Sequence, residues 1–187
     1  VNSHLDLSQC NASIIELESG NMVISWESDG QDGSVTGVYA RTIDPLGNFI
    51  SGEIALNTST ANNQSGACLT SLENDAFFAT WHSYRQDGSS FAVVGQFFNS
   101  DGSKNGNEFI VNTYTSNVQY SPQAITLADN SVIVAWSSLE QDGSGYGVYA
   151  QRYSQDGTKV GQEFRINETT SNHQMHGGLS QTVNGFI

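Results

Sequence analysis

Apolar residues occur along the chain in short blocks that return at a fixed interval. The most apolar block covers residues 22–26 (MVISW), and its counterparts are residues 77–81 (FFATW) and 132–136 (VIVAW). These blocks are apolar at neighbouring positions rather than at alternate ones, which is typical of a β-strand buried on both of its faces. No window of about 11 residues shows the helical period. The pattern therefore predicts an all-β protein.

The polar positions keep the same interval. The motif Gln-Asp-Gly-Ser recurs every 55 residues, at 31–34, 86–89 and 141–144. Many single residues share this register: Trp26, Trp81, Trp136, Gly47, Gly102, Gly157, Glu53, Glu108, Glu163, Asn57, Asn112, Asn167, Gln9, Gln64, Gln119 and Gln174. No insertion or deletion interrupts it. The chain is therefore a tandem array of one unit.

This register divides the chain into segments. Residues 1–8 form the end of a preceding repeat, 9–63, 64–118 and 119–173 are three full repeats, and 174–187 start a fourth. We therefore expect the chain to be a fragment of a longer repeat protein.

Each full unit carries four short segments with the features of strands. In the first unit these are residues 12–18, 22–26, 37–41 and 53–56, separated by turns rich in Gly, Asn and Asp. A four-stranded sheet repeated at this spacing predicts a β-propeller-like array of antiparallel blades. Closed propellers have roughly 4 to 8 blades, so we expect part of a longer propeller or an open array. A stacked β-sandwich or a β-solenoid is the structural alternative.

Charge and composition narrow the classes of partner. The net charge is −13, from 19 acidic and 6 basic side chains, which disfavours nucleic acid and anionic membrane surfaces as partners. Charged residues make up only 13% of the chain, about half of the usual share. No stretch approaches the roughly 20 apolar residues of a membrane span, so we expect no membrane insertion. Such a surface is typical of secreted β-proteins and predicts an extracellular or cell-surface location.

Two features bear on that location. Four sequons make N-glycosylation candidates of Asn11, Asn57, Asn63 and Asn167. The two cysteines, Cys10 and Cys68, form either one disulfide or a pair of buried thiols, and an oxidising compartment would permit the bond.

The Gln-Asp-Gly-Ser loops are the most regular polar feature. Repeated carboxylates in a turn are candidate Ca²⁺ ligands, and those in or beside the loops are Asp29, Asp32, Asp87, Glu140 and Asp142. The simpler interpretation is a turn in which Asp bonds the backbone and Gly takes a positive φ. The sequence favours this turn, and leaves calcium and a saccharide site as alternatives. We expect no other cofactor.

Catalytic signatures are missing from the sequence. There is no nucleophile elbow, phosphate-binding loop or His-Glu-x-x-His motif. Glu53, Glu108 and Glu163 recur in every unit, whereas the paired carboxylates of a glycosidase meet in one asymmetric site. The four histidines (His4, His82, His173 and His176) occupy no repeated position and have no zinc-site spacing. The sequence therefore predicts that the chain is not an enzyme.

The pattern Trp…Gln-Asp-Gly-Ser-x-x-Gly-Val-Tyr-Ala-Gln, clearest over residues 134–167, resembles the tandem repeats of large extracellular proteins of bacteria and ciliate protists. Some of those proteins carry haemolysin-type calcium-binding regions. The resemblance covers the whole chain and implies a propeller-like surface or secreted protein without known catalysis. The second unit departs from the pattern at Arg85 and at Phe91-Ala92, which makes a ligand site shared by all units less secure.

These observations favour a non-catalytic extracellular segment with a structural or adhesive role, such as part of a surface filament. Its partners would be other copies of itself or surface proteins. The alternative is a lectin-like propeller that binds carbohydrate through one weak site per unit, raised by avidity, with or without Ca²⁺. A glycoside-active enzyme is a third hypothesis.

Overall fold

The computed structural model describes residues 1–182 and 185–186. Over this part of the chain it consists of 14 β-strands and one short 3-10 helix, η1 (Glu73–Asp75). The prediction of an all-β protein is therefore confirmed. The described residues include no helix with the length and apolar character needed to cross a membrane.

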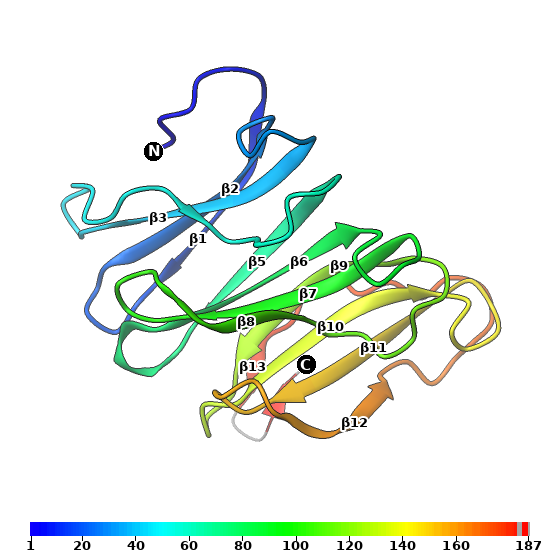
Figure 1. The fold of residues 1–187 in the computed structure, drawn as a ribbon. Helices are drawn as coiled ribbons and strands as arrows, with labels where there is room; N and C mark the ends of the chain where they lie inside the picture. The colour runs from blue at the N-terminus through cyan, green and yellow to red at the C-terminus, as the bar shows by residue number, and fades with distance from the viewer. Residues whose placement is uncertain (183–184, 187) are drawn as a thin grey trace.

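Twelve of the strands form three antiparallel sheets, in each of which the four strands follow one another in chain order (Figure 1). We call these sheets blades 1, 2 and 3. Blade 1 contains β1 (Gln9–Glu16), β2 (Met22–Asp29), β3 (Thr36–Ile43) and β4 (Ile54–Ala55). Blade 2 contains β5 (Gln64–Ser71), β6 (Phe77–Tyr84), β7 (Phe91–Phe98) and β8 (Lys104–Ile110). Blade 3 contains β9 (Gln119–Thr126), β10 (Val132–Leu139), β11 (Tyr146–Tyr153) and β12 (Lys159–Arg165).

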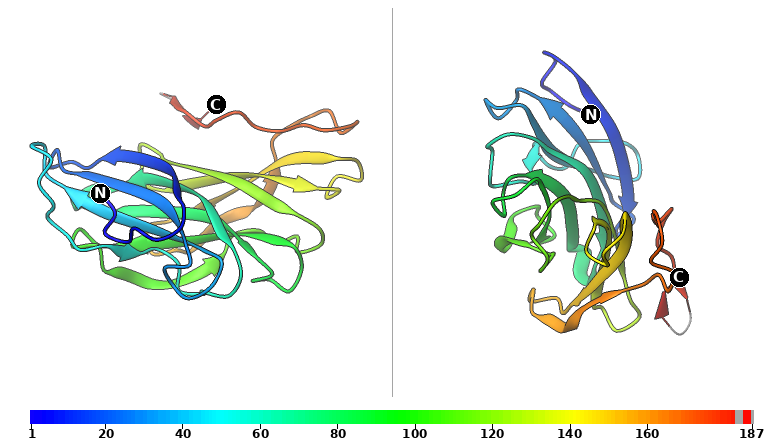
Figure 2. Two further views of the ribbon diagram at one scale, coloured as in Figure 1. Left: turned by 90° about the horizontal axis from the view of Figure 1, so that it is seen from above. Right: turned by 90° about the vertical axis from the view of Figure 1, so that its right-hand side faces the viewer.

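The blades are arranged as in a propeller. Their first strands lie nearest to one another, since β1 packs against β5 and β5 against β9. The fourth strands β4, β8 and β12 lie at the opposite edges of the sheets, and Figure 2 shows the three sheets turned progressively along the chain. After blade 3, β13 (Gln181–Thr182) and β14 (Gly185–Phe186) pair as a small two-stranded antiparallel sheet. The propeller-like array of four-stranded blades is confirmed.

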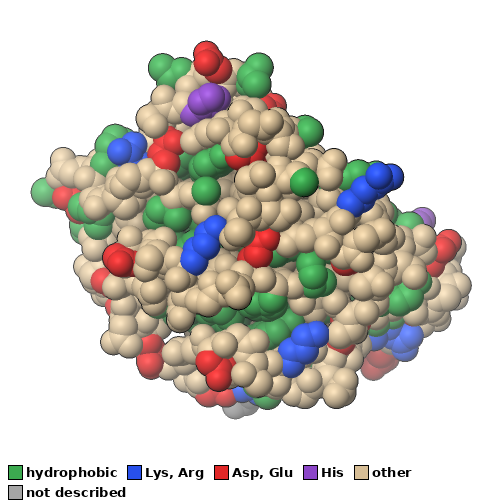
Figure 3. Space-filling model, viewed as in Figure 1, with side chains coloured by type: hydrophobic (Ala, Val, Ile, Leu, Met, Phe, Trp, Pro, Cys, Tyr) green, Lys and Arg blue, Asp and Glu red, His purple; other side chains and the backbone are tan. Residues whose placement is uncertain are grey.

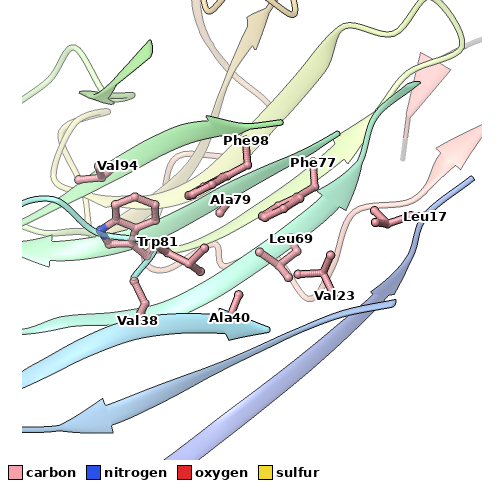
Figure 4. Close-up of a cluster of buried hydrophobic side chains, with 11 residues drawn as sticks. Leu17, Val23, Val38, Ala40, Leu69, Phe77, Ala79, Trp81, Val94 and Phe98 are labelled. Carbon is pink, nitrogen blue, oxygen red and sulfur yellow. The ribbon is translucent and has the colours of Figure 1, made fainter. Parts of the chain in front are cut away.

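Two apolar clusters fill the spaces between the blades. In the first, Phe77 and Trp81 of β6 meet Val23 of β2 and Val38 of β3 (Figure 4). In the second cluster, blade 3 repeats these contacts on the other face of blade 2, where β10 packs against Phe78. Neighbouring residues of β6 therefore face different blades, which explains the continuous apolar block in the sequence.

The tryptophans are part of this packing. Trp81 and Trp136 are fully buried and Trp26 is 4% exposed, so they are blade-packing residues rather than exposed platforms for a ligand. On the last blade, Leu179 and Phe186 of the C-terminal segment partly cover Ile133, Ala135 and Ala150. The surface is otherwise mainly uncharged, with charged side chains scattered singly over the face in Figure 3.

Candidate functional site

The Gln-Asp-Gly-Ser loops adopt the turn that the sequence favoured. Asp32 Oδ1 accepts a hydrogen bond from the backbone N–H of Ser34 at 3.0 Å. Asp87 and Asp142 make the same bond to the serine two residues on. Gly33 has a φ of 86°, a conformation that glycine adopts without strain. The turn is therefore held by its own side chains.

The other two predicted calcium ligands also have partners within the protein. Asp29 Oδ1 accepts from Thr36 Oγ1 at 2.7 Å, and Glu140 Oε2 accepts from Asn117 Nδ2 at 3.1 Å. Within residues 1–182 and 185–186, no three or more His, Cys, Asp or Glu side chains are grouped so that they could hold a metal ion. The five carboxylates are thus distributed over three separate loops.

The repeated glutamates join each blade to the segment that precedes it. Glu108 Oε1 accepts from the backbone N–H of Ser59 at 3.0 Å and from Gln86 Nε2 at 2.8 Å. Glu53 binds Ser3 and Gln31 in the same way, and Glu163 binds Thr113 and Gln141. Because each carboxylate satisfies backbone donors at a blade junction, these residues stabilise the array.

The repeated asparagines form a second link between units. Asn57 is 3% exposed, and its Oδ1 accepts from the backbone N–H of Val38 at 2.9 Å while Nδ2 donates to Ser59 O at 3.0 Å. Asn112 and Asn167 make equivalent bonds. A glycan on Asn57 Nδ2 would disrupt this contact.

The remaining sequons differ in accessibility. Asn11 is exposed in β1 and Asn63 is half-buried just before β5, whereas Asn167 is half-buried and hydrogen-bonded like Asn57. Of the four candidates, Asn11 is therefore the one whose side chain is free to carry a glycan without disturbing the blades.

Both cysteines are free thiols in the structure, so the disulfide that the sequence allowed is not formed. Cys10 is exposed, while Cys68 is half-buried and its Sγ accepts from the backbone N–H of Ala124 in the next blade at 3.4 Å. Burial raises the pKa of the Cys68 thiol, which keeps it protonated and unreactive.

The repeat is inexact at one end of the blades, and the departures from it lie together. The position after each repeated tryptophan holds Glu27, His82 or Ser137. This is the end where β6 and β10 run into their Gln-Asp-Gly-Ser loops, on the right-hand side of blades 2 and 3 in Figure 1. The positions that hold the blades together are repeated. Departures from the repeat that lie close together in space therefore indicate a local functional role.

The last cross-strand pair of the second and third strands shows the clearest change. In blade 1 this pair is Asp29 opposite Thr36, while in blade 2 it is Tyr84 opposite Phe91. Blade 3 places Tyr146 at the position of Phe91. A hydrogen-bonded polar pair in one blade is thus replaced by aromatic rings in the others.

These rings and their neighbours make one continuous row across the blades. The centroid distances between successive rings are 5.1, 5.0, 6.5, 5.2 and 5.5 Å. We call this set the aromatic row; in order, its members are Tyr84, Phe91, His82, Tyr120, Tyr146 and His173. The first five are half-buried and the last is exposed, so each ring keeps part of its surface accessible.

Beside His82, within the row, lie Glu27, Ser65 and Gly66, which we call the polar cluster. His82 Nε2 lies 2.9 Å from Ser65 Oγ, and Glu27 Oε1 accepts from the backbone N–H of Gly66 at 2.8 Å. Gly66 lies in a β-bulge of β5 with a φ of 68°, and a Cβ there would stand 2.5 Å from the His82 ring. The bulge and the glycine together admit the imidazole.

Burial shapes the protonation of this site. Desolvation lowers the pKa of His82, opposed by the nearby charge of Glu27, so the imidazole is neutral at neutral pH. His82 Nδ1 is buried and has no hydrogen-bond partner within the described chain. Burial, and secondarily Tyr146, raises the pKa of the Tyr120 hydroxyl, which therefore remains a donor. The site offers a carboxylate, a neutral imidazole and phenol groups.

Sequence reasoning did not find this site. It set His82 and His173 aside because they occupy no repeated position and have no zinc-site spacing, and it searched for chemistry among the repeated residues. The signal in the sequence was the set of departures from the repeat, at positions 55 residues apart such as Glu27 and His82.

Comparison with known proteins shows the fold but no family. No protein-family model matches the chain, and no curated protein matches it. Among solved structures, a protein of unknown function from Dyadobacter fermentans matches with a TM-score of 0.63 and 9% identity, over 93% of this chain and 59% of that one. A thermostable family-43 glycoside hydrolase matches with a TM-score of 0.53 and 11% identity, over 92% and 62% of the two chains.

A third match bears on the prediction that the chain is not an enzyme. An N-acetylgalactosamine deacetylase from F. plautii, solved with blood group B trisaccharide, gives a TM-score of 0.52 and 13% identity over 82% of this chain and 52% of that one. The prediction that the chain is not an enzyme is therefore corrected, because structures with its fold include a glycoside hydrolase and this deacetylase. The prediction rested on the absence of contiguous motifs and on the repetition of the glutamates, and neither argument tests residues that packing brings together from separate blades.

The chain spans between about half and three fifths of the length of these structures. At identities of 9 to 13% the likeness concerns the fold. The chain is thus an all-β, propeller-like array that shares its architecture with carbohydrate-active proteins.

Proposed function

We propose that the chain is a carbohydrate-binding propeller segment and that the aromatic row with its polar cluster is the binding site. The observation that carries the proposal is the continuous series of six accessible rings at the end of the blades where the repeat is broken.

The chemistry of the row suits sugars. The C–H face of a sugar packs against an aromatic ring, and its hydroxyls need polar groups at the ring edge. Tyrosine and histidine offer an apolar body with a polar tip, and few polar groups placed among apolar ones are typical of ligand sites. The phenol hydroxyls of Tyr84, Tyr120 and Tyr146 lie at ring edges and can donate to or accept from the hydroxyls of a sugar.

Two further observations support the proposal. The names of two proteins with this fold, a glycoside hydrolase and an N-acetylgalactosamine deacetylase, refer to carbohydrates. The uncharged polar composition also fits a secreted protein that meets glycans outside the cell, which is the location we propose.

A glycan array followed by calorimetry tests the function. We expect specific glycan binding, and we expect Tyr120→Ala to weaken it about fivefold, because stacking on one ring contributes roughly 1 kcal/mol. Phe49→Ala is the matched control, since Phe49 is 52% exposed on the β3–β4 connection of blade 1. Absence of glycan binding, or equal losses in both variants, would refute the proposal.

The same samples should be assayed for sugar or acetate released from the bound glycan. Release that falls with Glu27→Gln while binding persists would show that the site also turns over its ligand.

A further inference from the structure

We infer that the site takes a stretch of a neutral, soluble glycan chain, bound lengthwise across blades 2 and 3, rather than a single terminal sugar. This inference rests on the proposed function and names the class of its ligand.

The extent of the row is the first argument. Its rings come from β6, β7, β9, β11 and the segment after β12, so it crosses the boundary between blades 2 and 3 and continues to the C-terminal segment. A sugar ring is about as large as one aromatic ring and covers one or two members of the row. Filling all six rings therefore requires several linked sugars.

The tilt of the rings indicates the form of the chain. His82 is inclined by 84° to Phe91 and by 82° to Tyr120, and Tyr120 by 61° to Tyr146. Coplanar rings would suit the flat face of a crystalline polysaccharide. Rings that alternate between face and edge suit a single twisted chain, whose successive sugars present different faces.

Charge favours a neutral ligand. The polar cluster contains Glu27, only 7% exposed, and the chain as a whole carries a net charge of −13. A carboxylate or sulfate on the glycan would be repelled here. At the Tyr84 end of the row, Arg85 Cζ lies 5.3 Å from the centroid of the Tyr84 ring. This positive charge would attract an anionic glycan, so the experiment must include one as a competitor.

The row also has a defined limit on the blade 1 side. There the positions of Tyr84 and Phe91 are taken by Asp29 and Thr36, which bond each other. A longer glycan therefore gains contacts only until the row is filled, and affinity should level off with chain length.

Calorimetry with oligosaccharides of one to six units tests this. The neutral probes are β-1,4-linked gluco-, manno- and xylo-oligosaccharides, the anionic probes are oligogalacturonates, and microcrystalline cellulose provides a flat surface. We expect one neutral series to bind about tenfold more tightly at four units than at two, through roughly one or two more stacked rings, and then to level off. Binding to the cellulose surface and the oligogalacturonates should be weaker.

Variants at the two ends of the row provide the second measurement. Tyr84→Ala and His173→Ala should each weaken binding of the hexasaccharide several-fold and leave the disaccharide nearly unchanged, with Phe49→Ala as the control. His173 is exposed, so its loss leaves the core intact.

The outcomes separate the two proposals. Equal affinity for one and six units, with Tyr120→Ala still harmful, would overturn the lengthwise inference and leave carbohydrate binding standing. Tighter binding of oligogalacturonates would overturn neutrality, and tighter binding to the cellulose surface would overturn the single-chain form. No binding of any saccharide, here or on the array, would overturn both proposals.

Discussion

A single asparagine in each unit determines how one blade is joined to the next. Asn112, 4% exposed, accepts from the backbone N–H of Val93 at 2.8 Å and donates to Tyr114 O at 2.9 Å. It thereby holds the start of β7 against the segment that leads to blade 3. Removing the amide leaves a buried N–H and a carbonyl without partners.

We expect Asn112→Ala to lower the free energy of unfolding by about 1–3 kcal/mol, the usual cost of a buried unsatisfied group. Urea denaturation measures this. Asn107→Ala is the control, because Asn107 is exposed in β8 and should change stability little. Equal effects in the two variants would contradict the role given to Asn112.

Residue identity alone could not distinguish such roles. The sequence placed Asn57, Asn112 and Asn167 in one register, but it also made Asn57 and Asn167 glycosylation candidates. Only the burial of Asn57 and its bond to Val38 show why the amide recurs. The repeated glutamates were predicted to be structural, and their backbone partners agree with that prediction.

At the scale of the element, blade 2 shows how a sheet accommodates a larger side chain. Phe78 takes the place that Val23 and Ile133 hold in the other blades, and its diagonal neighbour on β7 is Gly95, where the other blades have Ala40 and Ala150. A Cβ on Gly95 would lie 2.7 Å from Phe78 Cζ. The glycine therefore compensates for the extra volume of the phenyl ring.

We predict that Gly95→Ala destabilises the protein by about 1–3 kcal/mol through overpacking. Adding Phe78→Val should recover part of this loss, so that the double variant is more stable than the sum of the single changes predicts. Urea denaturation of the four proteins measures the coupling. Gly52→Ala, with no atoms near its Cβ, should have little effect, and strictly additive losses would refute the compensation.

Strands were the part of the fold most readily predicted. The uninterrupted 55-residue interval, together with blocks apolar at neighbouring positions, sufficed to identify four-stranded blades packed on both faces. The aromatic row could not be found in the same way. Tyr84, Phe91, Tyr120 and Tyr146 come from four different strands, and it is the packing of blades and the bulge in β5 that brings their rings together.

At the scale of the whole molecule, His82 couples the junction of the blades to pH. It belongs to blade 2, faces Glu27 of blade 1 and lies against the ring of Tyr120 of blade 3. Its pKa is lowered by desolvation, so the unfolded chain binds more protons than the folded one at pH values between the two pKa values. Stability is then full above the ordinary histidine pKa of about 6.5 and falls as the pH drops below it.

We therefore expect the free energy of unfolding to decrease between pH 7.5 and pH 5.5, and His82→Gln to reduce this decrease. Chemical denaturation at the two pH values measures both. His176→Gln is a useful comparison, since burial also lowers the pKa of His176 outside the row. An unchanged pH dependence in His82→Gln would contradict the coupling.

The cross-strand pair that is Asp29–Thr36 in blade 1 and Tyr84–Phe91 in blade 2 occupies the same register position in both sheets. The contacts that hold the sheets together lie elsewhere, in the apolar clusters between the blades and in the hydrogen bonds of the repeated glutamates and asparagines. The residues of this pair can therefore be exchanged in one blade without altering the contacts between blades, and such an exchange changes ligand recognition at one end of the blades. Placing the pair of rings in blade 1, by Asp29→Tyr and Thr36→Phe, would extend the ligand-binding surface by one blade. Such substitutions offer a route to new ligand specificities on an unchanged fold.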